Sequence, residues 1–267
     1  MVIAARIRPR AAATPVAFPR TQDVALMPPT EDRAPSSAAR SAGARPAGEH
    51  STEERARSRW VPLTIGVLAL AGFVVMQFTI PGRGAAPLPI DVWWHDLMVS
   101  QRTDVGLAVA WVPAVVGGTI GMILIGLALL GLFWFLRRRW DALTVALAMI
   151  VSIAVAAPAA AIIGRIRPED SLAESVPTSF PSGHTALAAT AAIVIALIVR
   201  RWYAWVLAVL WIVFMAWSRT YLAAHWLTDV VAGALLGVAA AMLVWFVMET
   251  IRLRRHPKTD AGDQTPD

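Results

Sequence analysis

The chain has 267 residues, of which 57% are hydrophobic and 16% charged, a balance that excludes an ordinary soluble domain of this length. Its formal net charge is +6, yet no basic stretch is interleaved with base-stacking aromatic residues, so we expect no nucleic-acid partner. The absence of cysteine excludes disulfides and thiolate metal sites. Composition therefore predicts a protein of the lipid bilayer.

The two ends of the chain are polar. Residues 1–58 are rich in Ala, Arg, Pro and Ser and lack apolar periodicity, so we expect a disordered N-terminal tail. Arginines interrupt the first ten residues, which argues against a cleaved secretory signal. A second polar tail covers residues 252–267. Residues 59–251 between the tails form the predicted membrane domain.

Apolar stretches recur through this domain, and a helix needs about 20 apolar residues to cross the hydrocarbon core. The pattern predicts an all-α fold, a bundle of six transmembrane helices. The predicted spans are residues 60–80, 116–136, 141–163, 184–199, 203–219 and 226–249.

The segment between the first two spans needs a separate interpretation. Residues 91–103 mix tryptophans with charged side chains, which is typical of a helix on the membrane surface. The next apolar stretch begins near Val105 and carries Pro113 and the pair Gly117 and Gly118. This predicts either one long tilted helix or a short outer helix followed by a span.

The distribution of arginine predicts the orientation, because cytoplasmic flanks of spans carry excess Lys and Arg. One side of the predicted bundle carries Arg55, Arg57, Arg59, Arg137, Arg138, Arg139, Arg200, Arg201, Arg252, Arg254, Arg255 and Lys258. The opposite side carries only Arg83, Arg102, Arg165, Arg167 and Arg219. We therefore expect a cell-membrane protein with both termini in the cytoplasm.

Three polar segments interrupt the apolar chain, and the predicted topology puts all of them on the outer side. They are residues 164–168 (Gly-Arg-Ile-Arg-Pro), 181–184 (Pro-Ser-Gly-His) and 218–229, which begins Ser-Arg and contains His225 and Asp229. Arginine presents a planar fork of donors that matches phosphate oxygens. Ser182 and Gly183 lie where a span begins, and a helix N-terminus favours an anion. The segments together predict a phosphate site.

Two histidines supply the groups that phosphoryl transfer requires, a nucleophile and an acid for the leaving oxygen. Asp229 follows His225 by four residues, so within one helix the carboxylate would hold one ring nitrogen protonated and aim the other outward. We therefore expect His225 to be the nucleophile and His184 the general acid. Taken singly, the segments also fit an interface anchor, a turn and a capping pair, but their convergence on one side favours a site.

At these residues the sequence resembles the type 2 phosphatidic acid phosphatase family, whose signature is Lys-x6-Arg-Pro, Pro-Ser-Gly-His and Ser-Arg-x5-His-x3-Asp. The second and third elements match fully, at residues 181–184 and 218–229. In the first element Arg167 and Pro168 match, whereas Ala160 stands where the family has lysine. The resemblance covers about residues 60–250.

The resemblance implies a helical bundle with a metal-free site and no cofactor. It implies that His225 becomes transiently phosphorylated, Asp229 orients it and His184 protonates the leaving group. The residues that would bind phosphate are Arg167, Arg219, Ser182 and Gly183. Ala160 removes one cationic contact, and our hypothesis is that Arg165 supplies the missing charge from the same loop.

Other activities fit the same residues. Soluble vanadate-dependent haloperoxidases share this site, but six spans argue against that class. A phosphotransferase that passes the phosphoryl group to a lipid or sugar acceptor would use the same histidine, and a silent protein would bind lipid phosphate without turnover. For hydrolysis, the expected partner is a lipid phosphate or diphosphate: undecaprenyl diphosphate is favoured, with phosphatidic acid and phosphatidylglycerol phosphate as alternatives.

Overall fold

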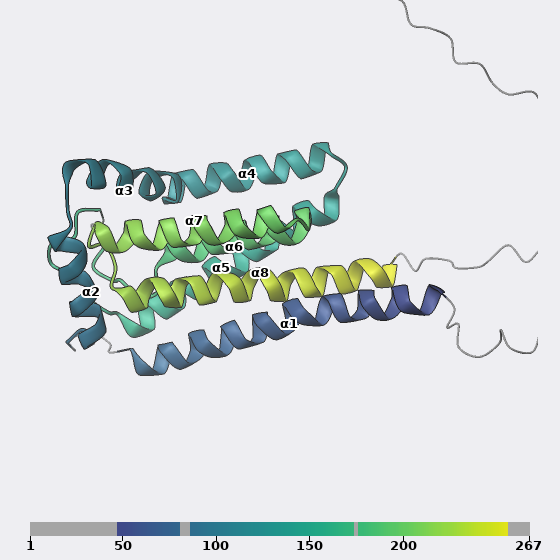
Figure 1. The fold of residues 1–267 in the computed structure, drawn as a ribbon, viewed down its shortest axis with the longest axis horizontal. Coiled ribbons are helices and arrows are strands. Elements are labelled where there is room, and N and C mark those ends of the chain that lie inside the picture. The colour runs from purple at the N-terminus through teal and green to yellow at the C-terminus, as the bar shows by residue number, and fades with distance from the viewer. Residues whose placement is uncertain (1–46, 81–85, 174–175, 256–267) are drawn as a thin grey trace, which may run out of the picture. The chain divides into compact units, whose positions relative to one another are not determined.

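The computed structural model describes residues 47–80, 86–173 and 176–255. Within these ranges every named element is a helix, which confirms the all-α prediction (Figure 1). In chain order the helices are α1 (Ala47–Thr79), α2 (Pro89–Ser100), α3 (Asp104–Val116), α4 (Thr119–Phe135), α5 (Arg139–Ile163), α6 (Gly183–Val199), α7 (Trp202–Tyr221) and α8 (Leu227–Arg255).

The N-terminal boundary differs from the prediction. Helix α1 begins at Ala47, so residues 47–58 of the predicted disordered tail are helical. This segment contains several Ala, Glu and Arg residues, which favour helix and let the spanning helix continue beyond its apolar part. Residues 1–46 and 256–267, which include the rest of the predicted tails, lie outside the described residues.

The helices make this a multi-pass membrane protein, with four to five candidate spans in the described part of the chain. Four helices are long and apolar enough to cross a bilayer: α1 from Trp60, α5, α7 and α8. Helices α3 and α4 form a fifth candidate if they count as one bent span. Helix α6 has 17 residues, fewer than the roughly 20 of a typical span. The six-span count therefore stays a prediction.

The second apolar stretch is two helices rather than one. Gly117 caps the end of α3 and Gly118 caps the start of α4. The axes of the two helices differ by 52° at this break. Of the two predicted arrangements, the structure has the short helix followed by a longer one.

Helix α2 confirms the helix that the sequence predicts after the first span. It begins with Pro89 at a first-turn position, where proline loses no helical hydrogen bond. Ile90, Val92 and Trp93 are exposed, whereas Asp91 is fully buried. The location of α2 on a membrane surface stays a prediction. One turn of this helix carries both exposed apolar side chains and a buried carboxylate.

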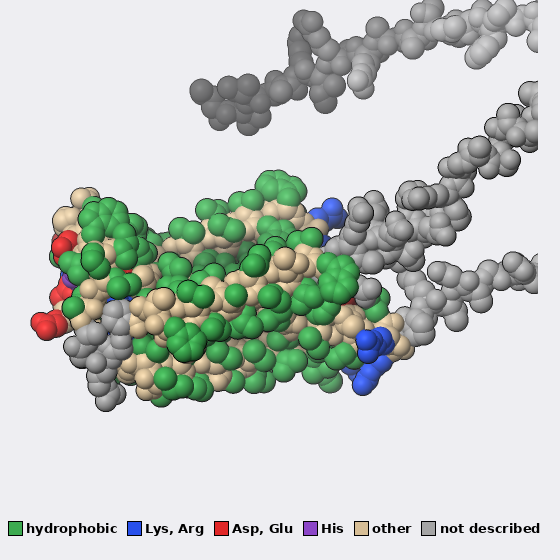
Figure 2. Space-filling view, turned by 90° about the horizontal axis from the view of Figure 1, so that it is seen from below, with side chains coloured by type: hydrophobic (Ala, Val, Ile, Leu, Met, Phe, Trp, Pro, Cys, Tyr) green, Lys and Arg blue, Asp and Glu red, His purple; other side chains and the backbone are tan. Residues whose placement is uncertain are grey.

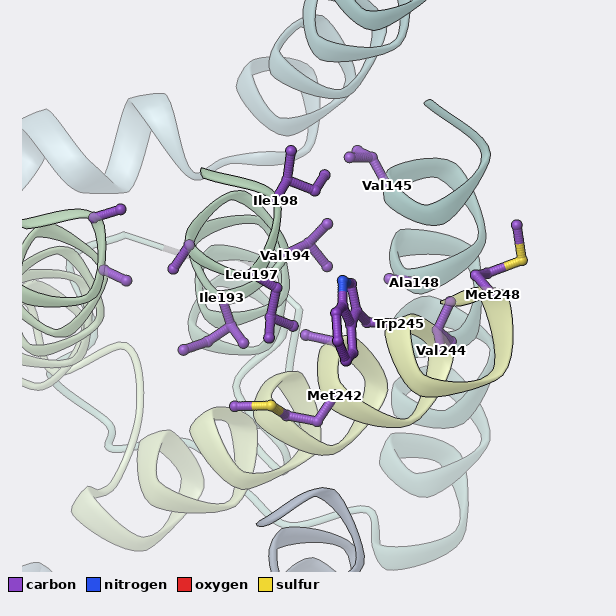
Figure 3. Packing of buried hydrophobic residues seen from close by; sticks show 14 of the residues in the cluster. Val145, Ala148, Ile193, Val194, Leu197, Ile198, Met242, Val244, Trp245 and Met248 are labelled. Carbon is purple, nitrogen blue, oxygen red and sulfur yellow. The ribbon is translucent and has the colours of Figure 1, made fainter. Parts of the chain in front are cut away.

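Among the described helices, α6 has the largest share of buried residues, and several of them belong to the main hydrophobic core. Ile193, Val194 and Leu197 of α6 pack against Met242 and Trp245 of α8 (Figure 3). Nearer the start of α6, Gly233 and Gly237 of α8 let the two backbones approach closely. A Cβ at Gly237 would lie within 3.0 Å of the Thr190 nitrogen and closer still to the carbonyl oxygen of Ala186.

Replacing Gly237 with alanine should therefore lower the thermal unfolding temperature of the detergent-solubilised protein. The added methyl group meets the backbone of α6, and overpacking of this kind destabilises by about 1–3 kcal/mol. Gly131→Ala on α4 is the matched control, because its Cβ would meet no atom within 4 Å. Equal unfolding temperatures for the two variants would contradict the tight α6–α8 contact.

The two ends of the bundle differ in charge. The described basic side chains at the ends of α4, α6 and α8 lie at the end opposite α2, and Figure 2 shows exposed basic side chains gathered there. The other end holds α2, the 164–182 loop and the start of α8, where Figure 2 shows acidic side chains. All three polar segments of the sequence therefore lie at one end, as predicted, while the side of the membrane that this end faces stays a prediction.

Candidate active site

The loop between α5 and α6 begins at a glycine. Gly164 has φ 59°, a left-handed conformation that ends α5 and turns the chain back across the bundle. The amide of Ser179 then donates to the carbonyl of Arg165 at 2.8 Å, and Arg167 Nε donates to the carbonyl of Val176 at 2.6 Å. The loop therefore folds on itself and fixes Arg165 and Arg167 beside the start of α6.

A cavity of about 610 Å³ lies between α4, α5 and α6. Its polar end is lined by Arg167, His184 and His225, together with Gly183 at the start of α6. The rest of its wall is mostly apolar, from α4 (Met122, Ile123, Leu127, Leu130) and α5 (Val145, Met149, Ile150, Ile153). The cavity thus has a cationic end that could bind a phosphate group and an apolar body that could hold a hydrocarbon chain, the two parts of a lipid phosphate.

His225 lies at this polar end and is 4% exposed. Its Nδ1 lies 2.7 Å from the carbonyl oxygen of Ser179. A carbonyl only accepts hydrogen bonds, so Nδ1 carries the proton and the lone pair of the neutral ring is on Nε2. Nε2 lies 3.1 Å from Arg167 NH1, which also donates to the carbonyl of Ala224. The unprotonated nitrogen therefore lies beside a cationic donor.

The relation between His225 and Asp229 differs from the predicted one. Helix α8 begins at Leu227, two residues after His225, so the pair does not share a helical face. Asp229 Oδ2 is 3.9 Å from Nδ1, beyond hydrogen-bond distance, and it accepts the backbone N–H of Trp226 at 2.9 Å. The Ser179 carbonyl orients the imidazole, and the carboxylate fixes the adjacent backbone instead.

The surroundings of His225 disfavour its protonated form. Burial lowers the pKa of His225 well below 6.5, and the charges of Arg167, Arg219 and His184 lower it further. His225 is therefore neutral at pH 7, the state that a nucleophilic imidazole requires.

A pH profile tests this inference. The acidic limb of kcat/KM should lie below pH 6.5, because activity falls only where His225 becomes protonated. Arg167→Gln removes a positive charge and should raise that pKa, which moves the limb to higher pH. Arg138→Gln at the opposite end is the control and should leave the limb in place. If the acidic limb does not move in Arg167→Gln, it does not report the protonation of His225.

Asp229 joins the three polar segments. Its Oδ1 accepts a hydrogen bond from Arg165 NH1 at 2.6 Å, and its backbone carbonyl accepts the N–H of Ser182 at 3.0 Å. Its Oδ2 holds the amide of Trp226, the residue after His225. One fully buried carboxylate residue thus ties the 164–182 loop, the start of α6 and the His225 segment together.

Arg165 does not occupy the place that our hypothesis gave it. Its guanidinium is 3% exposed and lies between Asp229 and Asp91, whose Oδ2 is 2.5 Å from Arg165 NH2. It is not among the described residues that line the cavity, whereas Ala160 is. Arg165 therefore does not supply the missing charge to the cavity wall, because its two terminal nitrogens bind the carboxylates of Asp91 and Asp229.

The other predicted site residues lie close by in different settings. Ser182 is buried and caps α6, where its Oγ lies 3.4 Å from the amide of Thr185. Gly183 faces the cavity. His184 lines it beside the α3–α4 break, since a Cβ at Gly118 would lie 3.8 Å from its Nε2. Arg219 is 1% exposed, and its carbonyl accepts the amide of His225 at 3.2 Å.

Two contributors had no signal in the sequence analysis. The Ser179 oxygen that orients His225 belongs to the backbone, which leaves no side-chain pattern. Asp91 lies in the predicted surface helix, where a carboxylate is ordinarily solvated. Its partner Arg165 is 74 residues away along the chain, so no spacing rule connects them.

Comparison with known proteins agrees with this geometry. Residues 141–253 match the model of the PAP2 superfamily. Over these residues the chain is similar to the PAP2 superfamily. The match covers α5 to α8 and thus every predicted site residue.

One curated relative is an undecaprenyl-diphosphatase of Sulfolobus acidocaldarius, 32% identical over 110 residues. The alignment covers 39% of this chain and 53% of the relative, so the chain spans about half the length of the curated relative that it matches.

Two solved structures share the fold. A transmembrane PAP2-type phosphatidylglycerolphosphate phosphatase from Bacillus subtilis superposes with a TM-score of 0.63 at 23% identity, covering 70% of this chain and 96% of that one. The LpxE protein of Aquifex aeolicus superposes with a TM-score of 0.53 at 21% identity, covering 59% and 96%. At these identities the likeness shows a shared fold.

Proposed function

We propose that this protein is a membrane phosphatase of the PAP2 type that hydrolyses a lipid phosphate or diphosphate through a phosphohistidine at His225. One observation carries the proposal: the unprotonated Nε2 of His225 lies beside Arg167 at the cationic end of an otherwise apolar cavity. Phosphatase names among its relatives agree with it.

These positions support a reaction in two steps. Nε2 of His225 attacks phosphorus, the bond from phosphorus to the leaving oxygen breaks, and His184 gives that oxygen a proton. Water then attacks the phosphohistidine, His184 takes a proton from it, and inorganic phosphate leaves. Arg167 at the cavity wall balances the charge on the phosphoryl oxygens, with the buried Arg219 as a second positive charge. Gly183 at the start of α6 offers its backbone N–H, whereas the N–H of Ser182 is bound to the Asp229 carbonyl.

The apolar body of the cavity favours a substrate with a hydrocarbon tail. Side chains from α4 and α5 line it beyond the cationic end, so the phosphate and the first part of a chain would enter together. Among lipids we favour undecaprenyl diphosphate, with phosphatidic acid and phosphatidylglycerol phosphate as alternatives. The arginine distribution supports an orientation with this reaction at the outer face and both termini in the cytoplasm.

The test is phosphate release by the purified protein in detergent and EDTA, from each of these three lipids. Release with water as sole acceptor supports the hydrolase and ranks the substrates. Release that requires a lipid or sugar acceptor would replace the proposal with a phosphotransferase. Binding of the lipids without release would replace it with a silent lipid-phosphate-binding protein.

Ala160 offers a gain-of-affinity prediction at the same site. Ala160 lines the cavity with Arg167, His184 and His225. A lysine there should add a charge-assisted contact to phosphate, worth about 1.5–3 kcal/mol, and lower KM by roughly 10- to 100-fold. Ala160→Met, which has similar length and no charge, is the control. Equal KM values for the two variants would contradict a phosphate position near residue 160.

A further inference from the structure

Helix α2 contributes a buried carboxylate to the site, although α2 lies outside the three polar segments. Asp91 is 0% exposed. Its Oδ2 accepts a hydrogen bond from Arg165 NH2 at 2.5 Å, and its Oδ1 accepts the backbone N–H of Thr228 at 2.9 Å. The Thr228 hydroxyl lies within 3.0 Å of both carboxylate oxygens. The carboxylate is therefore fully engaged by one guanidinium and the first turn of α8.

Arg165 has one charge and two carboxylate partners. NH2 binds Asp91, while NH1 binds Asp229 at 2.6 Å and the Thr228 hydroxyl at 2.7 Å. A buried guanidinium keeps its place only when its donors are satisfied. Removing Asp91 would leave NH2 without its acceptor and allow the planar group to turn, which would disturb the hydrogen bond to Asp229.

Two short paths lead from Arg165 to His225. Through its side chain, Arg165 holds Asp229, and Asp229 holds the amide of Trp226, the residue next to His225. Through the backbone, the carbonyl of Arg165 accepts a hydrogen bond from the N–H of Ser179. The carbonyl of Ser179 in turn accepts a hydrogen bond from Nδ1 of His225. A shift of Arg165 therefore acts on the imidazole from both sides.

We propose that Asp91 is a positioning residue, which fixes Arg165 and thereby the orientation of the His225 ring. This inference rests on the proposed function of His225. Asp91, like Arg165, is absent from the described residues that line the cavity, so it does not touch the substrate. A positioning role acts on the rate of the phosphoryl step, whereas a phosphate-binding role of the same network would act on affinity.

The experiment compares Asp91→Asn with Asp96→Asn, the same change on an exposed carboxylate of the same helix. We expect kcat of Asp91→Asn to fall about 10- to 100-fold, as for residues that orient a reactive group. KM and the inhibition constant of inorganic phosphate should stay within about twofold of wild type. Asp91→Glu, which keeps the charge, should recover part of kcat, and Asp96→Asn should match wild type.

Unchanged kcat in Asp91→Asn would overturn the inference, as would a loss confined to KM and phosphate inhibition. Where Asp91→Asn does not fold, Thr228→Val tests the same network. It removes the hydroxyl that donates to Asp91 and accepts from Arg165 NH1, and it should lower kcat at unchanged KM. Wild type and His225→Ala run in the same assay keep the two proposals apart. If His225→Ala abolishes turnover while Asp91→Asn does not reduce it, the positioning role alone fails.

Discussion

Replacing His225 with alanine should reduce phosphate release from every lipid substrate by at least about 10³-fold, because the variant has no atom to accept the phosphoryl group. Arg167 and the start of α6 remain, so KM should change far less than kcat. The loss should also remove any covalent phosphate from protein trapped by rapid denaturation at neutral or alkaline pH. The measurement is single-turnover phosphate release beside trapping of the phosphorylated protein.

The matched control is His95→Ala, which removes an imidazole at the same end of the bundle. His95 lies 3.3 Å from Asp170, its ring centre is 5.5 Å from that of Trp226, and it does not line the cavity in the described structure. A partly exposed pair of this kind contributes at most about 1 kcal/mol, so the activity should stay close to wild type. Retention of covalent phosphate in His225→Ala would reject the nucleophile assignment, even if turnover were lost.

The fold was predictable where it follows from apolar length. Helices α5, α7 and α8 each begin within two residues of the predicted spans, because a hydrocarbon core selects long apolar runs. The sequence did not decide whether α3 and α4 are one helix or two, since a glycine pair permits a break without requiring one. The extension of α1 to Ala47 was missed because polar residues also form helix when a span supports them.

The site was predictable in composition and not in its internal contacts. Polar residues at one end of apolar helices must meet, so His184, His225 and Arg167 share a cavity as expected. The hydrogen bond expected between Asp229 and His225 is replaced by a 3.9 Å approach, because α8 starts two residues after the histidine. Arg165 was misplaced because a sequence shows a charge without showing that a buried carboxylate on α2 binds it.

His184 gives the second large effect, and it separates the two chemical steps. His184→Ala removes the proton donor, so release of an alkoxide from phosphatidic acid should slow by about 10²–10⁴-fold. An aryl phosphate with an acidic phenol needs no proton for departure. With p-nitrophenyl phosphate the variant should therefore form the phosphohistidine at a rate near wild type.

The second step should still fail in this variant, because water must lose a proton as it attacks the phosphohistidine and His184 is the group placed to take it. The expected result with p-nitrophenyl phosphate is a burst of about one equivalent of p-nitrophenol per protein, followed by turnover slowed by about 10²–10⁴-fold. His95→Ala, with its imidazole outside the cavity, should turn over steadily without that stall. If His184→Ala loses the burst as well, His184 acts on phosphate binding rather than on proton transfer. His184 would then be a second positive group beside Arg167 at the polar end of the cavity, and would take the role that alanine at position 160 leaves open.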